Sequence, residues 1–187
     1  KNAYTQIRRA NIMLRNTNNG SLSDEDAAHW EDFMNSVEAT ALFPPNLKPP
    51  NYTAKGWIER QMKRYENDQL GLLALIEKKS GEFVGMSGLL WQEVNGKPEI
   101  EVGYHLRPKF WKNGYAREAA LYFMKFGFTV LKPESIISLI HINNVPSQRV
   151  ALTNGLTTNN KITENHGPAY VYRISKEGWE TKTQSPR

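Results

Sequence analysis

The segment from residue 99 to 120, EIEVGYHLRPKFWKNGYAREAA, gathers residues whose types and spacing could support chemistry. It begins with the pattern of a strand and ends with that of a helix, and Gly114 stands at the start of the helix. The first turn of a helix has unpaired N–H groups and the positive end of the helix dipole, and together these bind phosphate. Glycine lets the backbone approach an oxyanion, and Arg107 and Lys112 add positive charge nearby. A glycine at a helix start is weak evidence by itself, because ordinary strand-to-helix turns also use it.

A second group of polar residues begins another expected helix, after the next strand. Asn144 can cap this helix, and Ser147 lies three residues further on in its first turn. Residues of these types often bond only to the helix backbone. Helix capping and ligand binding are therefore both open for the pair, and one does not exclude the other.

The two segments together resemble the GNAT superfamily of acyltransferases. The family's acyl-CoA motif has Arg or Gln, two residues, Gly, one residue, and then Gly or Ala; Gly114 and Ala116 match it, whereas Trp111 stands at the Arg or Gln position. The run Glu-x-Gly-Tyr, Arg-Pro, Trp and Gly-Tyr-Ala-x-Glu-Ala is similar to the branch that acetylates N-termini of ribosomal proteins. Residues 144–150, NVPSQRV, resemble the helix start Asn-x-x-Ser-x-Arg-Val of that branch, although the Leu-Thr-Asn of 152–154 departs from its usual Glu-Lys pair.

The resemblance covers roughly residues 9–174 and implies a single GNAT domain over residues 1–187, with its core at about 9–175. The implied fold class is α/β: a mixed, mostly antiparallel central sheet of about seven strands, with flanking helices and a splayed parallel pair at 99–106 and 135–142. Acetyl-CoA would enter between the splayed strands as cosubstrate, and no metal is expected. The residues that the resemblance assigns to acetyl-CoA binding are Tyr104, Leu106, Arg107, Trp111, Lys112, Asn113, Gly114, Tyr115, Ala116, Asn144, Ser147 and Arg149.

The implied reaction is direct attack of a primary amine on the thioester in a ternary complex, and it needs a neutral amine. An α-amine with a pKa near ~8 is about a tenth neutral at pH 7, whereas a lysine or polyamine amine near ~10.4 is less than about a thousandth neutral. An α-amine therefore needs only a weak base or a chain of water molecules.

Glu101 is the candidate base, and it shares one strand face with Glu99 and His105. A carboxylate on a solvated strand face is an equal alternative. His105 is a second candidate base, although a half-buried strand histidine is more often structural. The resemblance makes Ser147 the donor to the leaving thiolate, and an N–H group of the strand near Tyr104 would bind the oxyanion.

Apolar periodicity and turn residues predict the elements that position these groups. Helices are expected over 21–37 (with Ser23 and Asp26 at its start), from the cap Thr53 onward, over 115–131 and over 144–154. Strands are expected at 9–15, 70–77, 83–91, 99–106, 135–142, 156–163 and 169–175. Asn95-Gly96 predicts a tight hairpin, and residues 99–142 predict a right-handed parallel crossover. Tyr170 and Tyr172 could reach the site from the last strand, although packing within the strand is the favoured expectation.

Composition excludes several classes of function. The 187 residues contain no cysteine, so disulfides, cysteine-ligated zinc and a cysteine nucleophile are ruled out. The longest apolar run, 70–76, is too short to span a bilayer, and the polar first residues do not resemble a signal peptide, so a cytoplasmic protein is expected. The net charge of +5 comes from scattered Lys and Arg, which favours a small anionic ligand over nucleic acid.

Two other functions stay open: a non-catalytic GNAT domain that senses acyl-CoA, and an RNA- or ribosome-binding module suggested only by the pI near 9.3. The chain could act as a monomer or a homodimer. The proline-rich loop 41–52 is expected to border the acceptor side, where Phe43, Leu47 and Tyr52 would form an apolar lining. Such a lining favours a peptide N-terminus or a small amine with an apolar body over a polycation.

Overall fold

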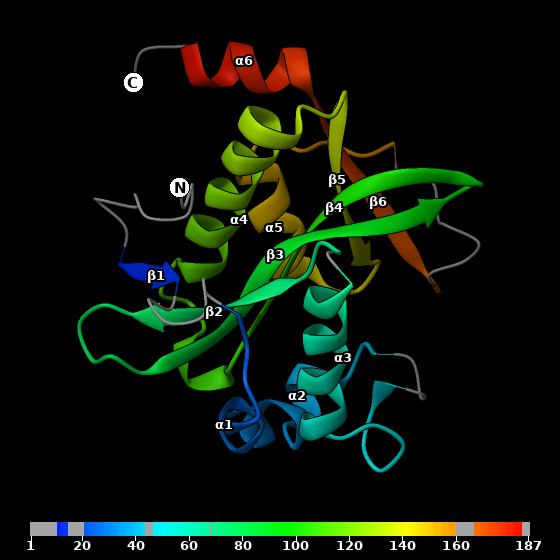
Figure 1. Cartoon of the computed structure of the whole chain (residues 1–187). Coiled ribbons are helices and arrows are strands. Elements are labelled where there is room, and N and C mark those ends of the chain that lie inside the picture. Colours follow the sequence, from blue (N-terminus) through cyan, green and yellow to red (C-terminus); the bar gives the residue numbers. More distant parts are fainter. Residues whose placement is uncertain (1–10, 15–20, 44–46, 68, 160–166, 185–187) are drawn as a thin grey trace.

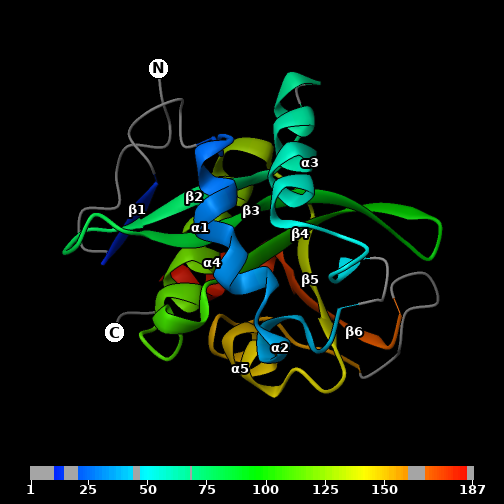
Figure 2. The ribbon, with the colours of Figure 1, turned by 90° about the horizontal axis from the view of Figure 1, so that it is seen from below.

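The computed structural model describes residues 11–14, 21–43, 47–67, 69–159 and 167–184, and these residues form one sheet with helices on both faces (Figures 1 and 2). The strands run in the order β1 (Ile12–Leu14), β2 (Leu72–Glu77), β3 (Phe83–Val94), β4 (Lys97–Leu106), β5 (Ser135–His141) and β6 (Ala169–Ser175). The helices are α1 (Glu25–Met34), α2 (Val37–Thr40), α3 (Ala54–Glu66), α4 (Tyr115–Phe126), α5 (Val145–Thr153) and α6 (Lys176–Gln184), with a 3-10 turn at Pro108–Phe110.

Strands β2, β3 and β4 form the antiparallel meander that the sequence predicts. Val94 pairs with Lys97 across the turn, and the two central residues, Asn95 and Gly96, both have positive φ, 52° and 74°. A two-residue hairpin turn needs this backbone conformation at both positions, which Asn-Gly adopts at low cost. The predicted hairpin is therefore confirmed.

The predicted parallel crossover is also confirmed: β4 leads through α4 to β5, which pairs with β4 in parallel. The other strand pairs are antiparallel, so the sheet is mixed, as expected. The predicted helix 115–131 is α-helical only as far as Phe126 and closes with a π turn over Gly127–Leu131, where Lys132 N–H donates to the Gly127 carbonyl. Gly127 packs against Ile136 so closely that a Cβ there would lie 2.7 Å from Ile136 Cδ1.

Two apolar cores lie on opposite faces of the sheet. Helices α1 and α3 cover one face with Trp30, Phe33 and Trp57, which pack on Met86 and its neighbours from the sheet. Helices α4, α5 and α6 cover the other face. Residues 119–124 of α4 contribute to the apolar core on that face. The sheet therefore separates two environments, and each side chain of a strand faces one or the other.

The number of strands was overestimated by one, because the segment 156–163 is not a strand in its described part. Thr157 makes only an isolated bridge with Arg173, and residues 160–163 lie outside the described residues. The segment continues with Thr158, Asn159 and Asn160, and asparagine disfavours the extended ladder.

The single helix predicted for 21–37 is also wrong in part, because it breaks into α1 and α2. Ser36 interrupts it by capping α2, where its hydroxyl accepts from Ala39 N–H. Val37, expected on the apolar stripe, is 85% exposed as a result. At the start of α1 the predicted Ser23–Asp26 pair is present, since the Asp26 carboxylate accepts from Ser23 N–H at 2.8 Å.

Helix α6 was not predicted. Its sequence, KEGWETKTQ, is mostly polar, and Trp179 is its buried residue. The Trp179 ring stacks on Phe128 with centroids 5.5 Å apart, so this tertiary contact fixes the helix rather than a periodic apolar stripe.

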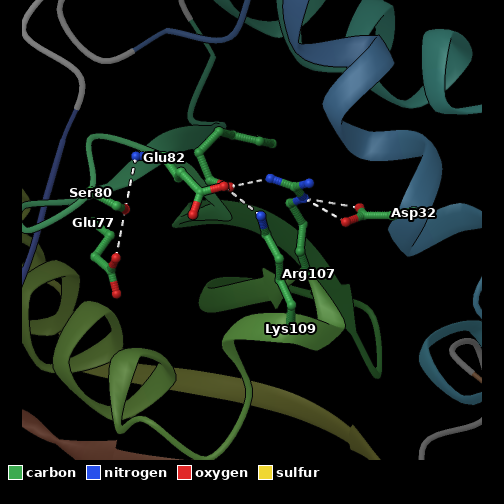
Figure 3. Close-up of polar contacts among 7 residues, drawn as sticks. Asp32, Glu77, Ser80, Glu82, Arg107 and Lys109 are labelled. Atoms are coloured by element: carbon green, nitrogen blue, oxygen red, sulfur yellow. Dashed lines mark hydrogen bonds and ion pairs between the residues drawn. The ribbon is translucent and has the colours of Figure 1, made fainter.

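An ion pair fastens α1 to the end of β4 (Figure 3). Arg107 Nε donates to both carboxylate oxygens of Asp32, at 2.9 and 2.8 Å, and its Nη1 donates to the Phe83 carbonyl at 2.7 Å. The arginine side chain is largely buried, whereas Asp32 is partly exposed. Nearby, Lys109 pairs with Glu82, and both of these side chains are half exposed.

We expect Asp32→Asn to lower the free energy of unfolding by about 1–3 kcal/mol, because the buried guanidinium loses its charged partner. Urea unfolding at pH 7 measures this loss. The control is Glu59→Gln, which removes the exposed α3 pair with Lys55 and should cost about 0.5 kcal/mol or less. Equal losses in the two variants would show that the Arg107–Asp32 pair does not fix α1.

Candidate active site

The parallel pairing of β4 with β5 is short, and the strands separate beyond it. Ile100 pairs with Ile136 and Glu101 with Ile137, whereas β4 continues to Leu106 and β5 to His141. We call this divergence the fork: residues 102–106 of β4 and 138–141 of β5. Backbone groups on the inner edges of the fork have no partner strand opposite them.

Glu101 lies at the base of the fork, on the sheet face covered by α1 and α3. Its side chain takes the place of the missing strand partner, because Oε1 accepts from Leu139 N–H at 3.1 Å. Its Oε2 accepts from Gln92 Nε2 at 2.6 Å, and the residue is only 8% exposed. Glu101 is thus a buried, hydrogen-bonded carboxylate rather than one on a solvated strand face. Glu99, the other acid on this face, is paired with Arg173 of β6.

On the opposite face, Tyr104 of β4 meets Ser147 of α5. The two hydroxyl oxygens are 2.7 Å apart, and Tyr104 Oη also lies 3.3 Å from the Ser147 carbonyl. Burial raises the pKa of Tyr104 to about 12, and the hydrogen bond with Ser147 opposes that rise. The phenol is therefore protonated at neutral pH and can donate to Ser147 Oγ, which leaves the serine proton available to another acceptor.

Asn144 caps α5, which is one of the two roles predicted for it, helix capping and ligand binding. Its Oδ1 accepts from Ser147 N–H at 3.2 Å, so the cap fixes the backbone of the same serine. Contact of Asn144 with a ligand stays a prediction. Arg149, one turn further along α5, is exposed and forms no ion pair with a described residue.

The loop before α4 leaves the N-terminus of that helix open to solvent. Gly114 is its N-cap, with φ of 83°, and a Cβ at this position would meet no atom within 4 Å. The first bond of the helix runs from Glu118 N–H to the Gly114 carbonyl, so the N–H groups of Tyr115 and Ala116 precede the bonded part of the helix. Lys112 also has positive φ, 64°, and residues 112–114 are exposed.

Several side chains expected to contact a cofactor have other partners. The Arg107 guanidinium is held by Asp32 and Phe83, and the Tyr115 hydroxyl donates to the Glu77 carboxylate, a bond that raises the tyrosine pKa to about 12. Trp111 Nε1 donates to the Leu106 carbonyl at 2.7 Å. The amide of Asn113 donates back to the carbonyls of residues 110 and 111. These contacts hold the side chains within the fold and shape the loop, while residues 112–114 stay exposed.

His105 lies on the same face as Glu101, inside a group of aromatic rings. Its ring centroid is 5.1 Å from Trp57, 5.7 Å from Phe43 and 6.0 Å from Phe33. Burial lowers the pKa of His105 to about 4, so the ring is neutral at pH 7. Protonation of a base at this position would be costly, which weakens His105 as the alternative to Glu101.

Two contributors to the site escaped sequence analysis. Gln92 orients the Glu101 carboxylate from the neighbouring strand, and the Tyr104 hydroxyl, rather than only its backbone, contacts Ser147. Strand alternation places Gln92 on the face of Glu101, but no sequence pattern shows that the two side chains meet. Tyr172 packs in the core, as expected, with its hydroxyl 3.3 Å from Gln148 Oε1.

Two further findings concern only the described residues. They contain no group of three or more His, Asp or Glu side chains arranged to hold a metal ion. None of their helices combines the length and apolar character needed to cross a membrane.

Two solved structures that share this architecture are acetyltransferases by name. The spermidine N-acetyltransferase of Vibrio cholerae, solved in complex with CoA and spermine, has a TM-score of 0.68 at 15% identity, with 91% of this chain and 98% of that chain covered. The ribosomal-protein-S5-alanine acetyltransferase of Vibrio fischeri has a TM-score of 0.64 at 14% identity, with 91% and 96% covered. These identities show a shared fold and nothing finer.

Sequence comparison adds the family. The uncharacterized protein YkkB of Bacillus subtilis (strain 168) is 27% identical over 171 residues, which span 91% of this chain and 96% of YkkB. Residues 20–157 match the family model described as an acetyltransferase (GNAT) domain. The chain therefore belongs to the GNAT family of N-acetyltransferases, as the resemblance at residues 99–120 and 144–156 indicates.

The lowered pKa of His105 predicts how stability changes with pH. An unfolded histidine binds a proton near pH 6.5, whereas His105 in the fold does so only near pH 4, so stability is lost as the pH falls between these values. His105 alone should lower the free energy of unfolding by about 2 kcal/mol between pH 7 and pH 5. Urea unfolding at both pH values measures this, and His105→Phe should lack the loss. An equal pH dependence in the variant would contradict the neutral, buried histidine.

Proposed function

We propose that this chain transfers an acetyl group from acetyl-CoA to a primary amine by direct attack in a ternary complex. The observation that carries the proposal is the division of groups across the fork. A buried carboxylate, Glu101, lies on one face, while the Tyr104–Ser147 hydroxyl pair and the start of α4 lie on the other. A thioester carbonyl in the fork would be open to an amine from the first face and to a proton donor on the second.

The described residues fit acetyl-CoA at the α4 and α5 face. The backbone of residues 112–116 would bind the pyrophosphate through helix N–H groups, with the exposed Lys112 as counter-charge. The space outside Gly114 is open, so no side chain blocks this approach. Asn144 and the edge of β4 at Tyr104 to Leu106, which faces no strand across the fork, would hold the pantetheine arm. Arg107 and Tyr115 would act by shaping the loop, because their polar atoms bond within the fold.

The residues of the fork would then divide the proton transfers. The amine nitrogen bonds to the thioester carbonyl carbon, and Glu101 takes the proton that the nitrogen must lose, directly or through water. The C–S bond breaks, and the thiolate takes the proton of Ser147 Oγ. Tyr104 passes its phenol proton to that oxygen in exchange, so no alkoxide is left on the serine, and the phenolate regains a proton from water. The chain contains no cysteine, so a cysteinyl acyl-enzyme is excluded, which is consistent with direct attack.

The fold does not choose the acceptor, because the neighbours with similar TM-scores include one solved with spermine and one that its name assigns to a ribosomal-protein alanine. We propose a peptide α-amine or a small-molecule amine. Phe43, Leu47 and Tyr52 are partly buried, and the rings of Phe43 and Tyr52 contact Trp57, which supports an apolar lining on this side. Pro44 and Pro45 of the same loop lie outside the described residues. We further propose a cytoplasmic monomer or homodimer.

An acyl-CoA sensor without transfer is the second candidate, and it is supported by the same loop. It would bind acetyl-CoA and release no CoA with any amine. An RNA-binding role finds no support beyond the basic pI.

Gly114→Val should abolish acetyl-CoA binding measured by calorimetry, because a β-branched residue at positive φ distorts the start of α4 and projects into the path of the phosphates. Gly81→Val is the matched control, since Gly81 also has positive φ, 75°, and open space around it, but lies in the β2–β3 turn. Both changes carry a similar backbone cost, so only the loss of binding should differ. Equal affinities in the two variants would remove this loop from the cofactor site.

Glu101→Gln should lower kcat/KM by about 10²–10⁴ and keep the acetyl-CoA affinity, because the amide can still accept from Leu139 N–H but cannot take a proton. In the pH profile of kcat/KM, the fall at low pH that comes from the enzyme's base should disappear, and only the dependence that comes from the acceptor amine should remain. Ser147→Ala is the comparison variant: it should slow turnover but keep the acidic limb. Full activity of Glu101→Gln in a thiol-release assay would assign the base elsewhere.

A further inference from the structure

Two arginines lie on α3, the helix whose Trp57 contacts His105 of the fork. Arg60 and Arg64 are one helical turn apart and continue a row begun by Tyr52 and Gly56, where the Tyr52 hydroxyl donates to the Gly56 carbonyl. The buried face of α3 beside them is held to the sheet by Gln61, which accepts from Leu72 N–H, and by Trp57 on Met86. Figure 2 shows α3 lying over β3 and β4.

Arg64 is a half-buried cation whose charge is not neutralised by a described residue. Its one hydrogen bond, to the Leu70 carbonyl, is 3.4 Å long, and it forms no ion pair within the described part of the chain. Burial is the main cause that lowers the pKa of Arg64, and the positive charge of the nearby Arg60 lowers it further. The Glu101 carboxylate raises it. The strand register agrees, because Arg64 donates to the carbonyl of Leu70, just before β2, and Leu72 pairs with Gly88 of β3. Two residues further along β3, Leu90 pairs with Glu101, so Arg64 lies near the proposed base.

The charges around the acceptor position are thus arranged asymmetrically. Glu101 supplies one negative charge, which is already shared by Gln92 and the backbone of Leu139, and Glu99 is neutralised by Arg173. Arg60 and Arg64 supply two positive charges, and His105 is neutral. A polyamine would bring further cations to a surface that already has excess positive charge. An anionic group would instead give Arg64 the partner it lacks.

We propose that the acceptor carries an anionic group, a carboxylate or a phosphate, which Arg64 binds with help from Arg60 while Glu101 faces the amine. This inference rests on the proposed acetyl transfer and adds the chemical class of the acceptor. It makes Arg64 a determinant of specificity rather than a participant in the bond changes. The planar guanidinium suits either anion, because both present two oxygens to its paired N–H donors.

The test uses peptide amides that share an N-terminal alanine and differ only in the second residue, so that the attacking amine stays the same. Ala-Glu, Ala-phosphoserine, Ala-Gln and Ala-Lys amides, together with spermine, separate carboxylate, phosphate, neutral and cationic acceptors. We expect CoA release with kcat/KM at least about tenfold higher for an anionic acceptor than for Ala-Gln amide, an effect expected mainly in KM. The glutamate and phosphoserine peptides decide between the two anions.

Variants then assign the preference to Arg64. Arg64→Gln should reduce the tenfold preference to near unity, because it lowers kcat/KM for the anionic acceptor far more than for Ala-Gln amide, and it should keep the acetyl-CoA affinity. Arg60→Gln should have a smaller effect in the same direction. Lys63→Gln is the matched control: it lies on the same helix, is exposed, and should keep the preference. Thermal melts confirm that each variant is folded.

Three outcomes would overturn the inference. Spermine or Ala-Lys amide as the best acceptor would contradict it and leave acetyl transfer intact. An anionic preference that survives in both Arg64→Gln and Arg60→Gln would contradict the assignment to these arginines. No CoA release with any acceptor would overturn the proposed function together with this inference.

Discussion

The structure depends on one constraint: where two parallel strands separate, the backbone groups between them need new partners. In this chain the Glu101 carboxylate accepts from Leu139 N–H at the point where β4 and β5 diverge. A buried N–H group without a partner would be destabilising by about 1–3 kcal/mol. The same carboxylate that satisfies the backbone is therefore also held in the fork, fixed further by Gln92. The side chain that supports the fold here is therefore also the proposed base.

The fork matters because the sheet has different chemistry on its two faces. On the α4 and α5 face, helix N-termini and the Tyr104–Ser147 pair supply N–H and O–H donors, which suit phosphates and a leaving thiolate. On the α1 and α3 face, Glu101, the neutral His105 and the arginines of α3 lie beside aromatic rings. The Arg107–Asp32 pair fastens α1 to the end of β4, the strand that borders the fork. In the proposed function, the face for an anionic cosubstrate and the face for an amine would thus be separated by a single layer of backbone.

Much of this architecture could be predicted from local sequence, because it is encoded locally. The Asn95-Gly96 turn needs residues that tolerate positive φ, and the helix starts at Gly114 and Asn144 follow from one cap residue each. The features that sequence analysis missed come from contacts between distant residues. Asp32 finds Arg107 across 75 positions, and α6 is held by Trp179 on Phe128 rather than by its own polar sequence. The extra strand at 156–163 was predicted from its local sequence pattern, but in its described part only an isolated bridge at Thr157 forms.

The central claim is that the acetyl group is transferred within the fork. A crystal structure of the chain with acetyl-CoA tests this most directly. The account predicts the thioester between β4 and β5, with its sulfur on the Ser147 side, the pyrophosphate at the first turn of α4, and Glu101 on the opposite side of the carbonyl. Acetyl-CoA bound away from the fork, or β4 and β5 paired continuously past Glu101 and Ile137 in the complex, would contradict it.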